Sequence, residues 1–179
     1  SAFDQAYDYA RKNLPEGRVR LPSAAADYEI MFVPTYLYKR LTFTGADFAA
    51  PRAALQQVGF FCHFVETDDD GPVETNADLV MAAIRAQAQS GRRLIIVSAS
   101  KSSPEVALAL TRLGRAETGH VAAWINTVGA LQGSPVADEG LAPELEYIVG
   151  KVDIAGKDSI TTARSRQRFF SFSSPYHLL

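Results

Sequence analysis

Short apolar runs alternate with amphipathic stretches through the middle of the chain. Four of the runs are rich in β-branched and aromatic residues, as buried β-strands are; they cover residues 28–36, 60–66, 92–100 and 120–129. Between them, apolar residues recur at helical spacing and predict helices over residues 48–58, 73–90 and 104–113. Strands that alternate with helices indicate βαβ units. The expected fold class is α/β, with three α/β/α layers around a mostly parallel central sheet.

The pattern weakens after Pro135. Only helix-compatible pieces follow, at residues 143–149 and 160–172, so residues 139–179 are expected to be helical without a fifth strand. We therefore expect one domain over residues 1–179, a fragment of a longer protein that lacks the last strands of its sheet. The apolar ending PYHLL predicts that a continuation of the chain, or a second copy in a homo-oligomer, covers this end.

Composition and charge exclude several classes of protein. The chain has 179 residues, 47% of them apolar and 21% charged, which is typical of a folded globular domain. Its net charge of −2 lacks the basic excess expected of a protein that binds nucleic acid or an anionic membrane surface. The apolar runs are shorter than the roughly 20 residues of a membrane span, so none is expected. The single cysteine, Cys62, excludes an internal disulfide and suits a buried thiol in a cytoplasmic protein.

The stretch VSASKSS ends the third predicted strand and leads directly into a helix. In open parallel sheets, ligands collect at the carboxyl ends of the strands, where this stretch lies. A nucleophile on a strained strand-to-helix turn needs small residues two positions before and after it, as in G-x-S-x-G. Ser98 and Ser102 take those positions around Ser100. The alternative is an ordinary serine-rich turn without chemistry.

The order of the strand ends resembles the central half of an α/β-hydrolase of the lipase and esterase kind, over about residues 28–138. The similarity rests on EIMFVPTYLYK, FFCHFVETDDDG, RRLIIVSASKSSPEVALAL and HVAAWINTVGALQGSPVADEG, of which the last is the most specific. The resemblance implies that Ser100 is the nucleophile. It also implies that the backbone N–H of Lys101 and that of Thr35 or Tyr36 form the oxyanion hole.

The sequence departs from this family at two places. Serines replace both glycines of the nucleophile turn, so the turn is degenerate. Pro34 and Thr35 stand where a His-Gly pair is usual in the oxyanion loop. These departures bear on activity more than on the fold.

A serine hydrolase also needs a histidine base. His63 lies within a predicted buried strand, and His120 lies at the amino end of another strand, the wrong edge of the sheet. His177 is therefore the candidate base.

The carboxylate that orients the base has three candidates before His177. Asp138 lies in the segment SPVAD, where the resemblance makes an acid more often structural than catalytic. Asp153 and Asp158 flank Gly156 and suit solvated turns. The candidate catalytic set is therefore Ser100, His177 and Asp138.

Two functions fit these residues. The first is a serine hydrolase that acts on small carboxylic esters or acyl substrates through an acyl-enzyme on Ser100. The second is a non-catalytic α/β-hydrolase-like domain that binds a ligand or partner and lacks a working triad. A nucleotide or phosphate site ranks last, because neither the Walker pattern nor G-x-G-x-x-G occurs. No cofactor and no metal are expected.

Overall fold

The computed structural model describes residues 4–5, 8–9, 12, 23–139 and 154–169. Its central sheet has four strands, all parallel, in the order β2-β1-β3-β4; they are β1 (Tyr28–Val33), β2 (Phe61–Phe64), β3 (Arg93–Ala99) and β4 (Val121–Thr127). Ser98 of β3 lies opposite Val33 of β1 and Asn126 of β4, so these three strands end at one edge of the sheet. The predicted parallel sheet is confirmed.

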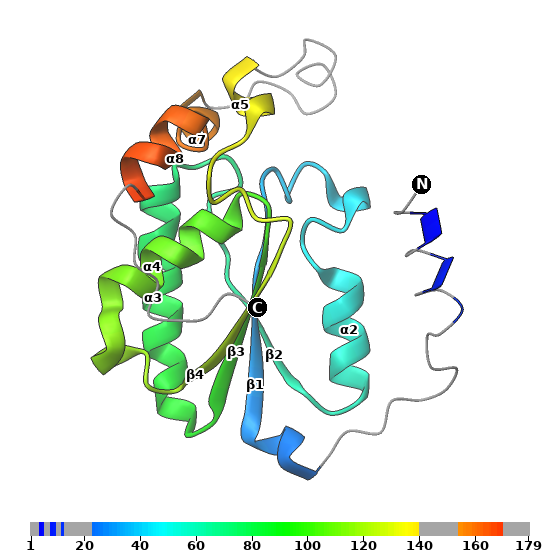
Figure 1. Cartoon of the computed structure of the whole chain (residues 1–179). Coiled ribbons are helices and arrows are strands. Elements are labelled where there is room, and N and C mark those ends of the chain that lie inside the picture. Colours follow the sequence, from blue (N-terminus) through cyan, green and yellow to red (C-terminus); the bar gives the residue numbers. More distant parts are fainter. Residues whose placement is uncertain (1–3, 6–7, 10–11, 13–22, 140–153, 170–179) are drawn as a thin grey trace.

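Helices cover both faces of this sheet. α2 (Ala49–Gln57) lies on one face, and α3 (Val73–Gln87) and α4 (Ser102–Glu117) pack together on the other (Figure 1). The chain runs from β1 outward to β2 and then back past β1 to β3. Because both connections are right-handed but run in opposite directions, their helices lie on opposite faces of the sheet. The three-layer α/β/α prediction is therefore confirmed.

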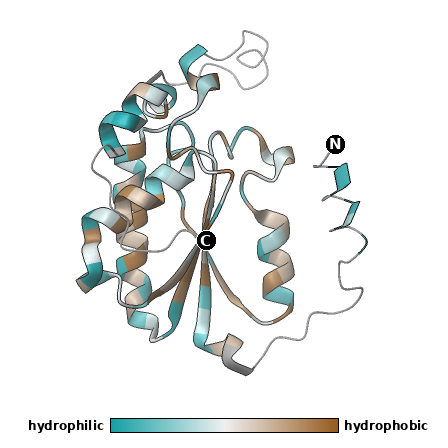
Figure 2. Cartoon of the chain, viewed as in Figure 1, coloured by the Kyte–Doolittle hydropathy of each residue, from teal (hydrophilic) through white to brown (hydrophobic). Residues whose placement is uncertain are grey.

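The main core lies between the sheet and the pair α3 and α4. Its buried side chains come from alternate positions of the central strands and from one face of each helix, and hydrophobic stretches run along both the strands and the packed helices in Figure 2. Met31, Val80, Ile84 and Ile96 are fully buried there. Burial of each such aliphatic side chain contributes roughly 1.5–3 kcal/mol, which anchors the strand ends that carry the site.

Two expectations about the strands were wrong. The first strand ends at Val33 rather than at residue 36, because Pro34 has no N–H to continue the ladder. The second strand is not buried on both faces, because β2 is an edge strand and Phe61 is 51% exposed. Cys62 is accordingly half-buried, and burial raises the pKa of its thiol.

From Pro135 onward the described elements are helices. α5 (Pro135–Glu139) covers most of the segment SPVAD, for which no helix was predicted, and α7 (Ile154–Asp158) and α8 (Thr162–Phe169) follow, the latter within the predicted helix at 160–172. The other predicted piece, 143–149, lies outside the described residues. No helix in the described ranges has the length and apolar character needed to cross a membrane.

Candidate active site

The loops that follow β1 and β3 leave the sheet toward opposite faces. β1 is followed by α2 and β3 by α4, and the two strands are neighbours in the sheet. Ligands of open parallel sheets usually bind in a crevice at the carboxyl ends of two such strands, where the connections to the next strands run in opposite directions. Tyr36 and Ser100, which the sequence singles out, follow these two strands.

Ser100 occupies the turn between β3 and α4 in a left-handed conformation, with φ of 49°. Left-handed backbone is unfavourable for a residue with a Cβ and has to be held by its surroundings. The Ser100 N–H donates to the Thr127 carbonyl at 3.3 Å, and its carbonyl accepts from the N–H groups of Ser103 (3.2 Å) and Ala130 (3.1 Å). The main chain of Ser100 is thereby satisfied, while its hydroxyl makes no hydrogen bond with any described residue.

The two serines that flank this turn are fully buried, and their hydroxyls have local partners. The Ser102 hydroxyl donates to the Ala99 carbonyl at 2.8 Å and thus closes the turn on itself. The Ser98 hydroxyl accepts from Trp124 Nε1 at 2.8 Å and lies 3.3 Å from the Ser103 hydroxyl. Serine is therefore accommodated at both glycine positions of the turn, because each hydroxyl is hydrogen-bonded.

Lys101 follows the turn, and its two polar groups lie in different surroundings. Its backbone N–H has no hydrogen-bond partner among the described residues, as an oxyanion-hole donor requires. Its side chain is buried and forms an ion pair with the Glu105 carboxylate one turn along α4. Burial raises the pKa of the Glu105 carboxyl, and the Lys101 ammonium and the Asn76 amide oppose this shift only in part.

Asn76 links this ion pair to a neighbouring loop. Its amide nitrogen donates to Glu105 Oε1 at 2.9 Å and to the Asp68 carbonyl at 2.8 Å, and its amide oxygen accepts from the Asp68 N–H at 3.0 Å. The Lys101 ammonium also lies 5.8 Å from the centre of the Tyr36 ring. One buried cluster therefore joins the loops that follow β1, β2 and β3.

Sequence reasoning missed this cluster. It assigned a role to the backbone of Lys101 and none to its side chain, to Glu105 or to Asn76. The Lys-to-Glu spacing of four residues at the start of a helix was a signal for the pair. Nothing in the sequence indicated that both charges are buried, since lysine and glutamate usually lie at the surface.

The loop after β1 was expected to supply the second oxyanion donor, from Thr35 or Tyr36. The Thr35 N–H donates to the Ala46 carbonyl at 3.0 Å, so this amide has a partner within its own loop. Leu37, with φ of 58°, donates its N–H to the Asp69 carbonyl at 2.8 Å and ties the loop to the one after β2. This bond argues against Thr35 as the second donor, and Tyr36 remains a candidate from the sequence alone.

The two described histidines lie away from the turn. Nε2 of His63, in the edge strand, is 3.1 Å from Oε2 of the buried Glu29. Nε2 of His120, at the amino end of β4, is 3.0 Å from the Ile84 carbonyl oxygen. The candidate base, His177, lies outside the described residues.

Asp138 has a local role in the structure. One carboxylate oxygen accepts from the Thr162 N–H and the other from the Thr162 hydroxyl, both at 2.8 Å, at the start of α8. A carboxylate at this position stabilises the amino end of a helix. Asp158 is exposed and pairs with Arg164, whereas Asp153 lies outside the described residues.

The described residues contain one group of carboxylates close enough to share a metal ion, Asp68 to Asp70. Arg40 lies against it, with 2.7 Å from Nη2 to Asp70 Oδ2 and 3.6 Å from Nε to Asp69 Oδ2. The guanidinium already supplies a positive charge to these acids. We therefore interpret this group as part of an ion-pair network that links the loop after β1 to the loop after β2.

The fold is similar to that of several solved ester hydrolases. A metagenomic carboxyl esterase superposes with a TM-score of 0.68 at 20% identity, over 90% of this chain and 51% of its own. Lipase BlEst2 of Bacillus licheniformis, in its mature form, gives 0.65 at 23% identity, over 86% of this chain and 62% of the lipase. Phospholipase PlaB from Legionella pneumophila gives 0.61 at 16% identity, over 82% and 36%.

These similarities concern the fold alone: the α/β arrangement of this chain superposes on that of an esterase, a lipase and a phospholipase. The chain spans less than two thirds of the length of each of these structures. No protein-family model and no curated protein matches the sequence.

Proposed function

We propose that this domain hydrolyses carboxylic esters with Ser100 as the nucleophile. The observation that carries the proposal is the left-handed backbone of Ser100 at the junction of β3 and α4. A serine held in this way exposes its hydroxyl above the sheet, next to the positive end of the helix that follows. The fold likeness to an esterase and two lipid hydrolases supports the same chemistry.

In the proposed reaction, the Ser100 hydroxyl oxygen attacks the ester carbonyl carbon while its proton passes to a base, for which His177 is the candidate. The Lys101 N–H and a second N–H from the loop after β1, for which Thr35 and Tyr36 are the candidates, stabilise the negative charge on the carbonyl oxygen. The carbon–oxygen bond to the alcohol then breaks, and the base returns the proton to the leaving alcohol. Water hydrolyses the acyl-enzyme by the same steps and releases the acid.

A binding domain without catalysis is the second candidate. It is favoured by the described histidines, which both lie away from Ser100. In that case the turn persists as part of the fold, and the crevice holds a ligand without cleaving it.

A fluorophosphonate probe separates the two functions. We expect the probe to label the wild-type protein at Ser100 and to leave Ser100→Ala unlabelled. Ser134→Ala is the matched control, because only the main chain of Ser134 makes hydrogen bonds with described residues. Hydrolysis of p-nitrophenyl butyrate should depend on Ser100 and His177 but not on His63 or His120. A wild-type protein that is not labelled, or equal labelling of Ser100→Ala, would exclude the hydrolase.

A further inference from the structure

A cavity of about 540 Å³ lies between the segment that follows β4 and helix α8. Leu131 and Pro135 form an apolar part of its wall, and Gln132, Thr162, Ser165 and Arg166 contribute polar groups. Helix α8 itself is mostly hydrophilic in Figure 2. None of these residues was assigned a role from the sequence.

The loop wall of the cavity is fastened to the nucleophile turn. The Ala130 N–H donates to the Ser100 carbonyl at 3.1 Å, and the Gly133 N–H donates to the Ala130 carbonyl at 3.0 Å. Leu131, the first residue of the cavity wall, therefore directly follows Ala130, which is hydrogen-bonded to Ser100.

The helix wall is held against the loop just as closely. Gly133 has φ of 90°, and a Cβ there would lie 2.7 Å from the Thr161 carbonyl oxygen. The Ser134 N–H donates to the Ile160 carbonyl at 3.0 Å, and Asp138 binds the start of α8 through Thr162. Both walls are thus positioned relative to Ser100.

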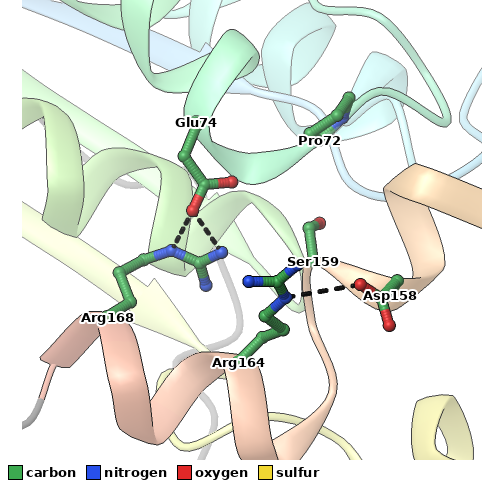
Figure 3. Close-up of a pocket in the computed structure, with 6 residues that line it drawn as sticks. All are labelled: Pro72, Glu74, Asp158, Ser159, Arg164 and Arg168. Carbon is green, nitrogen blue, oxygen red and sulfur yellow. Dashed lines mark hydrogen bonds and ion pairs between the residues drawn. The ribbon is translucent and has the colours of Figure 1, made fainter.

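The arginines of α8 differ in their partners. Arg168 binds Glu74 and Arg164 binds Asp158, and these pairs line a separate, charge-balanced cavity at the start of α3 (Figure 3). Arg166 lines the larger cavity, and no described acid pairs with it. Beside it, the Ser165 hydroxyl is buried without a hydrogen-bond partner among the described residues.

We infer that this cavity binds the part of the substrate that lies away from the reacting ester, and that this part is a short apolar chain ending in a carboxylate. The inference rests on the proposed function, since it takes Ser100, to which the loop wall of the cavity is hydrogen-bonded, as the reacting residue. Leu131 and Pro135 cover the methylene groups of such a chain. The Arg166 guanidinium and the Ser165 hydroxyl are donors without an acceptor in the part of the chain that the structure describes, and a carboxylate accepts from both.

Binding of hexanoate tests the inference without hydrolysis. In chemical-shift titrations we expect hexanoate to bind about 3- to 10-fold more tightly than hexanamide, its uncharged analogue, as one partly exposed ion pair allows. Arg166→Gln should abolish this difference. Arg164→Gln, on the same helix but paired with Asp158, should retain it. Equal affinities in the wild-type protein, or an unchanged preference in Arg166→Gln, would overturn the inference.

Titrations of Ser100→Ala measure the hexanoate preference in a protein without the proposed nucleophile, whereas probe labelling of the wild-type protein tests the nucleophile itself. The two measurements therefore test this inference and the proposed function separately. Hexanoate preference without probe labelling of wild-type Ser100 would refute the hydrolase and leave the carboxylate site in place. Labelling of Ser100 without hexanoate preference would refute the carboxylate site alone.

Discussion

The side chains of Lys101 and Glu105 form an ion pair that is almost completely removed from solvent, each with 2% of its surface exposed. Asn76 supplies a second donor to the same carboxylate oxygen at 2.9 Å, and Glu105 Oε2 has no hydrogen-bond partner among the described residues. Two charges are thus buried at the start of α4, next in the chain to the proposed nucleophile turn. Each is tolerated there only because the other is present.

Removal of one partner from this pair should be costly. We expect Lys101→Met to lower the free energy of unfolding by about 3–5 kcal/mol, because it leaves the Glu105 charge buried without compensation. The double variant Lys101→Met/Glu105→Leu should recover most of this loss. Urea denaturation of the single and double variants measures the difference.

Arg85→Ala is the control for this cycle. Its pair with Glu117 is exposed, with 51% and 42% of the two side chains accessible. It should therefore contribute little to stability, because solvent screens an exposed pair. If Lys101→Met is no more destabilising than Arg85→Ala, the buried pair does not hold the turn.

The stability of the domain should depend on the ionisation of Glu105. Burial raises the pKa of this carboxyl, so the folded protein retains a proton that the unfolded chain has already lost. The free energy of unfolding should therefore fall as the pH rises from about 4, the ordinary value, to the raised pKa. Glu105→Gln cannot ionise and should lack this fall. Identical pH profiles of the two proteins would contradict the prediction.

Gly129→Ala should displace the loop after β4. A Cβ at this position would lie 2.6 Å from Asn126 Nδ2 and 2.7 Å from Ser103 Cβ, and the Ser103 hydroxyl holds Asn126 by a 2.6 Å hydrogen bond. We expect a loss of stability of about 1–3 kcal/mol from overpacking, together with slower labelling of Ser100. Gly119→Ala, where the nearest atom is 3.9 Å away, is the control and should change neither.

Substitutions of Asp138 distinguish a helix cap from a catalytic acid. Asp138→Ala removes both bonds to Thr162 and should lower stability by about 1 kcal/mol, whereas Asp138→Asn retains a capping oxygen and should be nearly neutral. We expect both variants to hydrolyse p-nitrophenyl butyrate at the wild-type rate. A large drop in rate for the stable Asp138→Asn would instead identify Asp138 as the acid of the triad.

The sequence alone determined the elements that depend on local periodicity. Apolar runs and helical spacing located four strands and the helices between them, because the alternation of side chains follows from backbone geometry. The position of Ser100 also followed, since a buried strand that leads straight into a helix places its junction at the carboxyl edge of a parallel sheet.

Only the tertiary structure decided the order of the strands and the surroundings of the turn. Nothing local distinguishes the edge strand β2 from the central β1, since both are short apolar runs. The burial of Lys101 depends on a carboxylate one turn away and on Asn76 of another helix. Whether a charge stays in water or enters a core is set by the partners that folding brings around it, and Asn76, which binds the same carboxylate as Lys101, lies far from both residues in the chain.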